Sequence, residues 1–460
     1  MLRPYSFFRM LLRDARSSTE IIYPWQLPDI MRKHIVTGAM GTIYFVLLGL
    51  YLVPFGTSIG MQYWHWGVLS AACSFVLVLE VFSAYMVART GIRRSLWFLT
   101  ALAGRLLRGL GIAAAFLFMR ASGNLSLGLF LLLLVAAACF EAIADPPWFS
   151  WLADIIPHGE HGRFWGRRSA WIALAGLLVT VPIGYAVDHV TEDLKLTAFM
   201  MVFGFGFTLG ILDLIIHRTI PEPRMKMPPR RAFWHEMKAP FLDPGFRPWL
   251  IFNAVWTFSM TLGGSLAMVY FVDDLKIRGN FTGGSLVLVV VPQVVTVLTA
   301  PLFGRMVDSA GTKRTMLWSY AIWALWPLFW VPATPETALF WLGLGAVVGS
   351  VGVTGGLNAG LKFVTRQPPA GHVATYVAVS TSTASVAGGF GPLVAGFALQ
   401  ALKGRSWQIA GLTVIGFHLL FVASFLLRSL SILGIRRIPE PHQTGPAPSD
   451  QQAPSPAPSA

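Results

Sequence analysis

The sequence RTIPEP at residues 218–223 returns as RRIPEP at residues 436–441, 218 positions later. Each copy ends a long apolar run, so the chain reads as two similar halves in tandem. A second pair agrees in spacing, because TGIRR at residues 90–94 is matched by AGTKR at residues 310–314. Repetition at this long period predicts two related structural units rather than one irregular domain.

The composition indicates which solvent surrounds these units. Hydrophobic residues make up 55% of the 460 residues and charged residues only 12%, whereas a soluble domain carries about 25% charged residues. Lipid must therefore cover much of the surface, and two related bundles in lipid are typical of transporters. The net charge of +14 is scattered over connecting loops without a basic stripe, which argues against a nucleic-acid partner. Both cysteines lie in apolar runs and indicate no disulfide framework.

Twelve apolar runs are each long enough to cross a bilayer core of about 30 Å as a helix. They cover residues 35–57, 65–88, 95–119, 125–147, 169–189, 196–217, 248–271, 283–305, 314–332, 337–363, 373–400 and 407–430. The runs are continuous rather than alternating in polarity, which favours helices over a barrel. The predicted fold is an all-α membrane protein with twelve transmembrane helices in two pseudo-symmetric six-helix bundles.

The predicted domains follow from these runs. We expect an amphipathic surface segment over residues 1–34, bundles over residues 35–217 and 248–430, a linker over residues 218–247, and a disordered tail over residues 431–460. Lys and Arg are concentrated on the side of the N-terminus, which places both termini and the linker in the cytoplasm. We expect the protein in the cell inner membrane. The opposite loops hold Arg120, Lys195, Lys276, Arg278, Lys403 and Arg405.

The loops after the second and eighth runs carry a recognisable motif. In the second copy Gly304 precedes Asp308 by four positions, and Gly311 and two basic residues follow. Ala84 and Ala88 replace the glycine and the aspartate in the first copy. By these motifs and the twelve runs, the chain resembles the major facilitator superfamily, and in particular bacterial members with no assigned substrate. The motif residues considered are Arg89, Gly91, Arg93, Arg94, Gly304, Arg305, Asp308, Gly311, Lys313 and Arg314.

The resemblance implies a carrier that alternates access to a central site and a gate that latches the cytoplasmic ends together in one transport state. Because Ala88 is not an acid, we expect asymmetric gating that depends more on Asp308. The alternative is that Asp308 only caps a helix or solvates a tight loop.

Charged residues inside the apolar runs are the strongest indication of a site, because each costs about 2.5–3.5 kcal/mol at a helix centre. They are Glu80, Arg105, Arg108, Glu141, Asp145 and Asp213. One interpretation is an ion-pair cluster that staples the helices, and the other is a coupling site for a proton or Na⁺. The resemblance implies that the fourth span lines the cavity, so Glu141 is the first choice for coupling, with Arg105 bracing it and Asp213 structural.

The second half offers neutral polar and aromatic side chains as a substrate cavity. The candidates are Asn253, Trp256, Met260, Gln293 and Asn358. Such groups can hydrogen-bond to a polar organic solute or stack on it near the bilayer midplane. The alternative for each is hydrogen bonding between helices or core packing.

No phosphate-binding GxxxxGK[ST] loop and no grouping of catalytic residues occurs, so we expect neither an enzyme nor a cofactor or metal site. The predicted function is ion-coupled symport of a small organic solute by a monomer surrounded by membrane lipids, with H⁺ or Na⁺ as the coupling cation. Two alternatives stay open: proton-coupled efflux of amphiphilic compounds, and a membrane sensor or assembly factor that does not transport.

Overall fold

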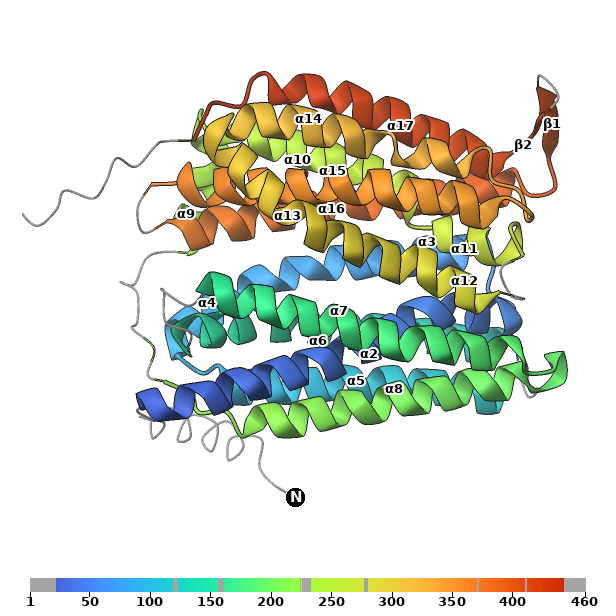
Figure 1. Ribbon diagram of the computed structural model, residues 1–460, viewed down its shortest axis with the longest axis horizontal. Helices are drawn as coiled ribbons and strands as arrows, with labels where there is room; N and C mark the ends of the chain where they lie inside the picture. Colours follow the sequence, from blue (N-terminus) through green and yellow to red (C-terminus); the bar gives the residue numbers. More distant parts are fainter. Residues whose placement is uncertain are drawn as a thin grey trace, which may run out of the picture.

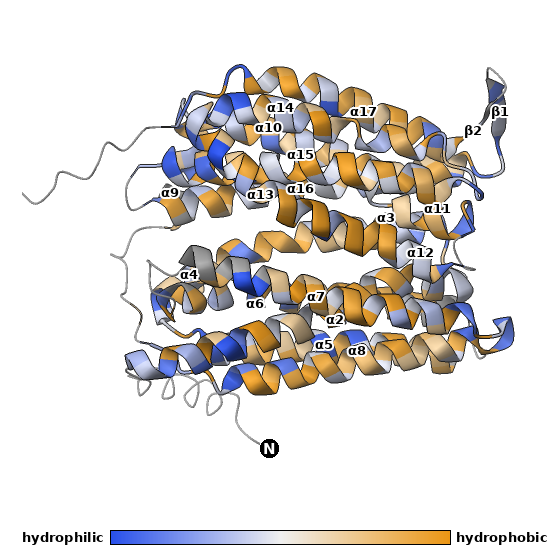
Figure 2. Ribbon diagram, in the orientation of Figure 1, coloured by the Kyte–Doolittle hydropathy of each residue, from blue (hydrophilic) through white to orange (hydrophobic). Residues whose placement is uncertain are grey.

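The computed structural model describes residues 22–118, 123–155, 161–223, 225, 233–276, 280–369, 372–409 and 412–441. Most of the predicted amphipathic segment and of the predicted tail falls outside these residues. The helices lie nearly parallel and form two groups side by side (Figure 1). Figure 2 shows hydrophobic residues along most of their length and hydrophilic residues mainly toward the ends, as a membrane-spanning protein requires.

The first half contains six crossings. Their elements are α2 (Leu27–Ser58, after η1, Pro24–Gln26), α3 (Tyr63–Phe75) with η2 (Val76–Val78) and α4 (Leu79–Thr90), α5 (Arg94–Phe118), α6 (Gly123–Ile155), α7 (His161–Asp188), and α8 (Lys195–Arg218, after η4, Glu192–Leu194).

The second half follows a short linker helix, α9 (Phe233–Leu242). Its elements are α10 (Arg247–Gly264) with α11 (Ala267–Asp273), α12 (Phe281–Ser285) with η6 (Leu286–Val290) and α13 (Val291–Ser309), α14 (Thr312–Ala324) with η7 (Trp326–Trp330), α15 (Ala338–Arg366), α16 (Val373–Ala401), β1 (Ser406–Ile409), β2 (Leu412–Ile415) and α17 (Gly416–Ile435).

The predicted number of twelve crossings is confirmed. Among the described residues, eleven helices are long and apolar enough to span a membrane. The remaining crossing is the ninth, where α14 passes into η7. Pro327 lies in the first turn of η7, and a proline removes a backbone donor and interrupts an α-helix.

The predicted boundaries of the last crossing are wrong at both ends. Residues 407–409 and 412–415 form an antiparallel hairpin in which Ser406 pairs with Ile415, because β-branched residues such as Thr413 and Val414 favour strands. The helix α17 then continues beyond residue 430 to Ile435. Ile438 is fully buried, so the ordered chain extends into the segment predicted as tail.

The two halves contact each other most closely at one end of the molecule. We call it the hairpin end, because β1 and β2 lie there, and the opposite end, where α9 lies, the linker end (Figure 1). The most extensive packing between the halves joins α3 to α16 and α7 to α12. A Cβ on Gly67 would lie 2.7 Å from the carbonyl oxygen of Pro392 and 2.9 Å from the Cα of Gly396, so glycine is required for this approach.

Hydrogen bonds reinforce that contact. Asp188 at the end of α7 accepts the backbone amides of Phe281 at 2.6 Å and Thr282 at 2.9 Å, and the Thr282 hydroxyl at 2.6 Å. Ser285 donates to the carbonyl of Thr180 at 3.4 Å. Within the described ranges, these are the hydrogen bonds recorded between the two halves, and all of them join α7 to the α12 segment.

Candidate functional site in the first half

The two duplicated motifs meet at the linker end of each half. Glu222 accepts the backbone amides of Arg93 at 3.1 Å and Arg94 at 3.3 Å, at the start of α5. Glu440 likewise accepts the amides of Thr312 and Lys313, at the start of α14. A carboxylate is favourable at the positive end of a helix dipole. The motif residues are therefore tied to the end of the sixth helix in their own half.

The predicted gating residues all lie at the linker end, and the described contacts of Arg89, Arg93 and Asp308 stay within one half. The side chain of Arg93 is fully buried and lies 2.5 Å from Asp154, and Arg89 lies 2.5 Å from the hydroxyl of Tyr85. Asp308 accepts from Lys362 of α15 at 2.7 Å. The described residues thus contain no ion pair that latches the two halves at this end.

The remaining motif residues occupy turns or the helix surface. Gly91 and Gly311 have φ angles of 69° and 92°, in the left-handed region that favours glycine. Lys313 donates to the carbonyl of Arg436 at 2.6 Å. The side chains that are exposed here belong to Arg305 and Arg314, and Gly304 lies in open space on α13.

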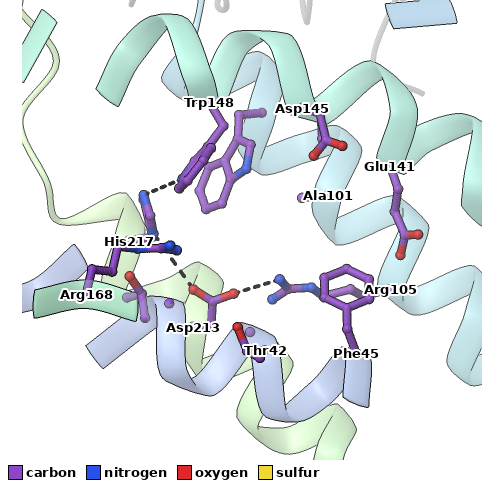
Figure 3. A pocket seen from close by; sticks show the side chains of 15 residues that line it. Thr42, Phe45, Ala101, Arg105, Glu141, Asp145, Trp148, Arg168, Asp213 and His217 are labelled. Atoms are coloured by element: carbon purple, nitrogen blue, oxygen red, sulfur yellow. Dashed lines mark hydrogen bonds and ion pairs between the residues drawn. The ribbon is translucent and has the colours of Figure 1, made fainter. Parts of the chain in front are cut away.

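A cavity of about 200 Å³ lies inside the first half, between α2, α5, α6, α7 and α8. Most of the charged residues predicted from the apolar runs gather around it (Figure 3). Its polar lining includes Arg105, Glu141, Asp145, Arg168, Asp213 and His217.

One ion pair in this cavity is fully enclosed. Arg105 on α5 lies 2.6 Å from Asp213 on α8 and also donates to the carbonyl of Gly210. Each side chain of the pair is only 7% exposed. Gly41 gives the pair room, because a Cβ there would lie 3.0 Å from Asp213. Arg105 therefore forms its ion pair with Asp213 and not with Glu141, and its expected support of Glu141 stays a prediction, as does the structural role of Asp213.

His217 extends the enclosed pair toward the linker end. The indole Nε1 of Trp148 donates to Nε2 of His217 at 3.1 Å, and Nδ1 of His217 lies 3.8 Å from Asp213 (Figure 3). An imidazole that accepts at Nε2 carries its proton on Nδ1 when neutral, which turns that proton toward the carboxylate. The ring of His34 packs edge-on against His217, with centroids 4.6 Å apart.

A second ion pair is more open. Glu141 on α6 accepts from Arg108 on α5, and these side chains are 19% and 15% exposed. The second carboxylate oxygen of Glu141 is buried without a hydrogen-bond partner among the described atoms. A Cβ on Gly104 would lie 2.9 Å from Cγ of Glu141, so this glycine lets the glutamate pack against α5. Arg108, rather than Arg105, is the partner of Glu141.

Two further carboxylates lie close to this open pair. Asp145 is exposed to the cavity one helical turn beyond Glu141, and Glu80 on α4 is near enough to interact with Asp145 electrostatically. Ser83 donates to the carbonyl of Ile143 at 2.6 Å, which fixes α4 against this part of α6. The region around this cavity thus has one closed ion pair, Arg105–Asp213, and one open ion pair, Arg108–Glu141, with further acids beside it.

The predicted substrate residues of the second half have different surroundings among the described residues. Asn253 donates to Ser380 on α16 at 3.3 Å, and Trp256 is buried against Tyr320. Gln293 lines an apolar recess between α7 and α13, and Asn358 is half-buried on α15. Met260 lines a separate cavity of about 300 Å³ within the second half.

Sequence analysis missed the charged residue of that cavity. Arg428 on α17 is fully buried, and its guanidinium lies over the rings of Trp256 at 5.7 Å and Trp326 at 5.6 Å. Arg428 lies two residues before the predicted end of the last crossing at residue 430, and it was not among the charged residues predicted inside the apolar runs. The polar spacing of Ser424, Arg428 and Ser431 on one helix face is the signal that would have revealed it.

Arg428 lacks an acidic counterpart. In the described part of the chain, no carboxylate lies within 4.0 Å of its guanidinium, and its Nε has no partner. Two cation–π contacts contribute about 0.5–2 kcal/mol each. That is less than the cost of several kcal/mol for burying an unpaired ion.

Comparisons with known proteins agree with this architecture. Residues 258–459 match the sequence profile of the Major Facilitator Superfamily. The fold, over about nine tenths of the chain, is similar to that of solved transporters. The second half of the chain is thus similar in sequence to the Major Facilitator Superfamily, and the chain shares the fold of solved transporters.

Three solved structures illustrate the similarity of the fold. An auto-inhibited POT family peptide transporter is 13% identical, with a TM-score of 0.68 over 91% of this chain and 99% of the other. The nucleoside transporter NupG is 10% identical and a D-xylose–proton symporter 14% identical. Each has a TM-score of 0.65 over 89% of this chain and 98% of the other. No curated protein matches the chain. The protein is thus a multi-pass membrane protein with the fold of solved transporters.

Proposed function

We propose that the protein is a secondary carrier for a small organic solute, coupled to a cation through the open Arg108–Glu141 pair. The single observation that carries this proposal is the contrast between the two ion pairs of the first half. Arg105–Asp213 is sealed, with side chains 7% exposed, whereas the side chains of Arg108 and Glu141 remain 15% and 19% exposed. A coupling group must exchange its partner for an ion from water, and the open pair can do so.

The chemistry of coupling follows from this pair. When a proton or Na⁺ binds Glu141, the carboxylate no longer holds the guanidinium of Arg108, and an uncompensated cation remains inside the membrane. The uncompensated guanidinium of Arg108 favours either a movement of α5 against α6 or the binding of a solute that accepts a hydrogen bond from it. Asp145 and Glu80 extend the acidic surface that draws the cation to Glu141.

Access to the site in this conformation is from the linker end, since the halves are clasped at the hairpin end through Gly67, Gly396 and Asp188. With the linker end in the cytoplasm and the protein in the cell inner membrane, as the loop charges predict, the structure represents an inward-facing state. Symport of a polar solute is the direction we propose, and the peptide, nucleoside and D-xylose transporters of like fold support a small organic solute.

Proton-coupled efflux of an amphiphilic compound is a second candidate. The observation that favours it is the apolar, tryptophan-lined cavity of the second half, which suits an amphiphile better than a sugar. Symport and efflux predict opposite directions of net solute flux for the same imposed proton gradient.

The test is transport into proteoliposomes that contain the purified full chain, with a panel of nucleosides, peptides, sugars and aromatic acids and an imposed H⁺ or Na⁺ gradient. We expect one class of solute to move with the gradient, and Glu141→Gln to retain exchange of that solute but lose its response to the gradient. The matched control is Glu192→Gln, which removes an exposed acid paired with Lys195. An unchanged gradient response in Glu141→Gln, at normal protein levels, would overturn the coupling role.

A further inference from the structure

Each half has a buried arginine that links its third and sixth helices, but the arginine lies on the third helix in the first half and on the sixth helix in the second half. The spacing of the duplicated RTIPEP stretch, 218 residues, places Gly210 opposite Arg428 and Asp213 opposite Ser431. In the first half, Arg105 on the third helix donates to the carbonyl of Gly210 on the sixth. In the second half, Arg428 on the last helix donates back to the carbonyl of Trp323 on α14, at 3.3 Å.

The reciprocal arrangement leaves the second arginine without a counter-ion. The position equivalent to Asp213 is Ser431, whose hydroxyl donates to the carbonyl of Arg428 at 2.7 Å and supplies no negative charge. Arg428 is fully buried, and its only described hydrogen bonds go to the carbonyls of Trp323 and Met260, both at 3.3 Å. A buried arginine presents planar donors that match a carboxylate or a phosphate.

The surroundings of Arg428 provide space for a ligand. It lines the cavity of about 300 Å³ in the second half and is the one charged residue among the described residues around it. The walls are aromatic and aliphatic, with Trp323, Trp326 and Trp330 on one side and Leu342 and Ala346 on the other. The volume lies at the small end of ligand pockets and suits a compact aromatic or aliphatic body.

We infer that this cavity is a binding site for a small amphiphilic anion, whose acidic group pairs with Arg428 and whose apolar body packs against the tryptophans. The anion supplies the charge that Asp213 supplies in the first half. Such an anion can be a dissolved aromatic or aliphatic acid or the headgroup of an anionic lipid. Both carry an acidic oxygen group on an apolar body.

Binding is testable without transport, so this inference stands or falls separately from the proposed coupling role. The purified full chain in phosphatidylcholine nanodiscs is titrated with 4-bromobenzoate, whose bromine quenches the fluorescence of tryptophans in contact with it. We expect saturable quenching by 4-bromobenzoate and at least tenfold weaker quenching by the neutral analogue 4-bromobenzamide. Equal quenching by both compounds would overturn the inference.

Variants separate the role of Arg428 from general effects on the protein. We expect Arg428→Gln to weaken the binding of 4-bromobenzoate at least tenfold and Arg428→Lys to retain much of it. Arg405→Gln, which removes an exposed charge at the hairpin end, should bind like the parent protein. Unchanged affinity in Arg428→Gln would refute the site.

A second variant keeps the test informative if Arg428→Gln does not fold. Ala346→Leu retains the arginine but fills the cavity, so quenching by 4-bromobenzoate should fall at least tenfold. Unaltered quenching in this variant would show that the anion binds elsewhere. Repeating the titration with phosphatidylglycerol in the nanodisc identifies the source: competition indicates a lipid headgroup, and its absence indicates a dissolved acid.

Discussion

Glu222 and Glu440 are structural counterparts: each carboxylate accepts two consecutive backbone amides at the start of the third helix of its own half. The repeated stretch that reveals the two halves in the sequence is therefore also the element that joins the sixth helix of each half to the third. The repeated sequence therefore forms the same carboxylate–amide contact in both halves.

The two counterparts should differ in their effect on stability. Glu222 is buried and lies 3.5 Å from the fully buried Arg93, whereas the amide donor Lys313 beside Glu440 is more exposed. Loss of one partner from a buried ion pair costs about 3–5 kcal/mol, and loss of a helix cap costs about 0.5–2 kcal/mol. We expect Glu222→Ala to lower the thermal unfolding midpoint clearly more than Glu440→Ala in the same detergent. Equal shifts would show that Asp154 alone satisfies Arg93.

Arg105 and Asp213 should behave as one unit. Because both side chains are enclosed, either single change, Arg105→Gln or Asp213→Asn, leaves an unpaired buried charge and should destabilise the protein by about 3–5 kcal/mol. The double variant removes both charges and should recover most of that loss. Size-exclusion profiles and chemical unfolding of the four proteins measure the coupling. Additive losses in the double variant would contradict the pairing.

Asp188 should control opening at the hairpin end. Asp188→Ala removes the acceptor of three hydrogen bonds that join α7 to the start of α12. We expect faster amide hydrogen exchange at residues 281–285 and 63–69, on the two sides of the contact between the halves. Glu192→Gln, an exposed acid at the same end, serves as the control. Unaltered exchange at both segments would mean that glycine packing alone holds this end closed.

Asp274 should give the stability of the protein a defined pH dependence. Burial, with the charge of Asp273 nearby, raises the pKa of the Asp274 carboxyl from 3.8 to about 6. The folded protein then binds this proton more tightly than the unfolded chain. The stabilising contribution is full below pH 4 and is lost as the pH rises toward 6. Unfolding midpoints between pH 4 and 7 should fall less steeply in Asp274→Asn than in the parent protein, and parallel profiles would contradict this.

The sequence predicted the architecture well because composition and repetition act over the whole chain. Patterns hundreds of residues long predict the number of crossings and the two halves. They also predict the group of membrane-buried charges around Glu141. The partner of Glu141 could not be predicted, because Arg105 and Arg108 are three residues apart and share a helix face. Which of them meets α6 and which meets α8 depends on how α5 is rotated in the bundle.

The end of the chain was harder to interpret. The apolar residues 407–415 suit a strand as well as a helix, and periodicity does not separate the two in so short a run. The predicted last crossing ends at residue 430, whereas α17 continues to Ile435, so Arg428 lay next to the predicted end of the helix. Arg428 is the one buried charge among the described residues of the second half, and it was missed because of a boundary error of about five residues.

The meeting of Gly67 with Gly396 has a mechanical consequence. Where two helices touch through bare backbone, there are no interlocking knobs that must disengage before one helix can pivot on the other. The contact between these two glycines is smooth, whereas the packing of Phe75 on Phe390 and the hydrogen bonds of Asp188 beside it stiffen the joint. A single methyl group at either glycine would push the two backbones apart at this point.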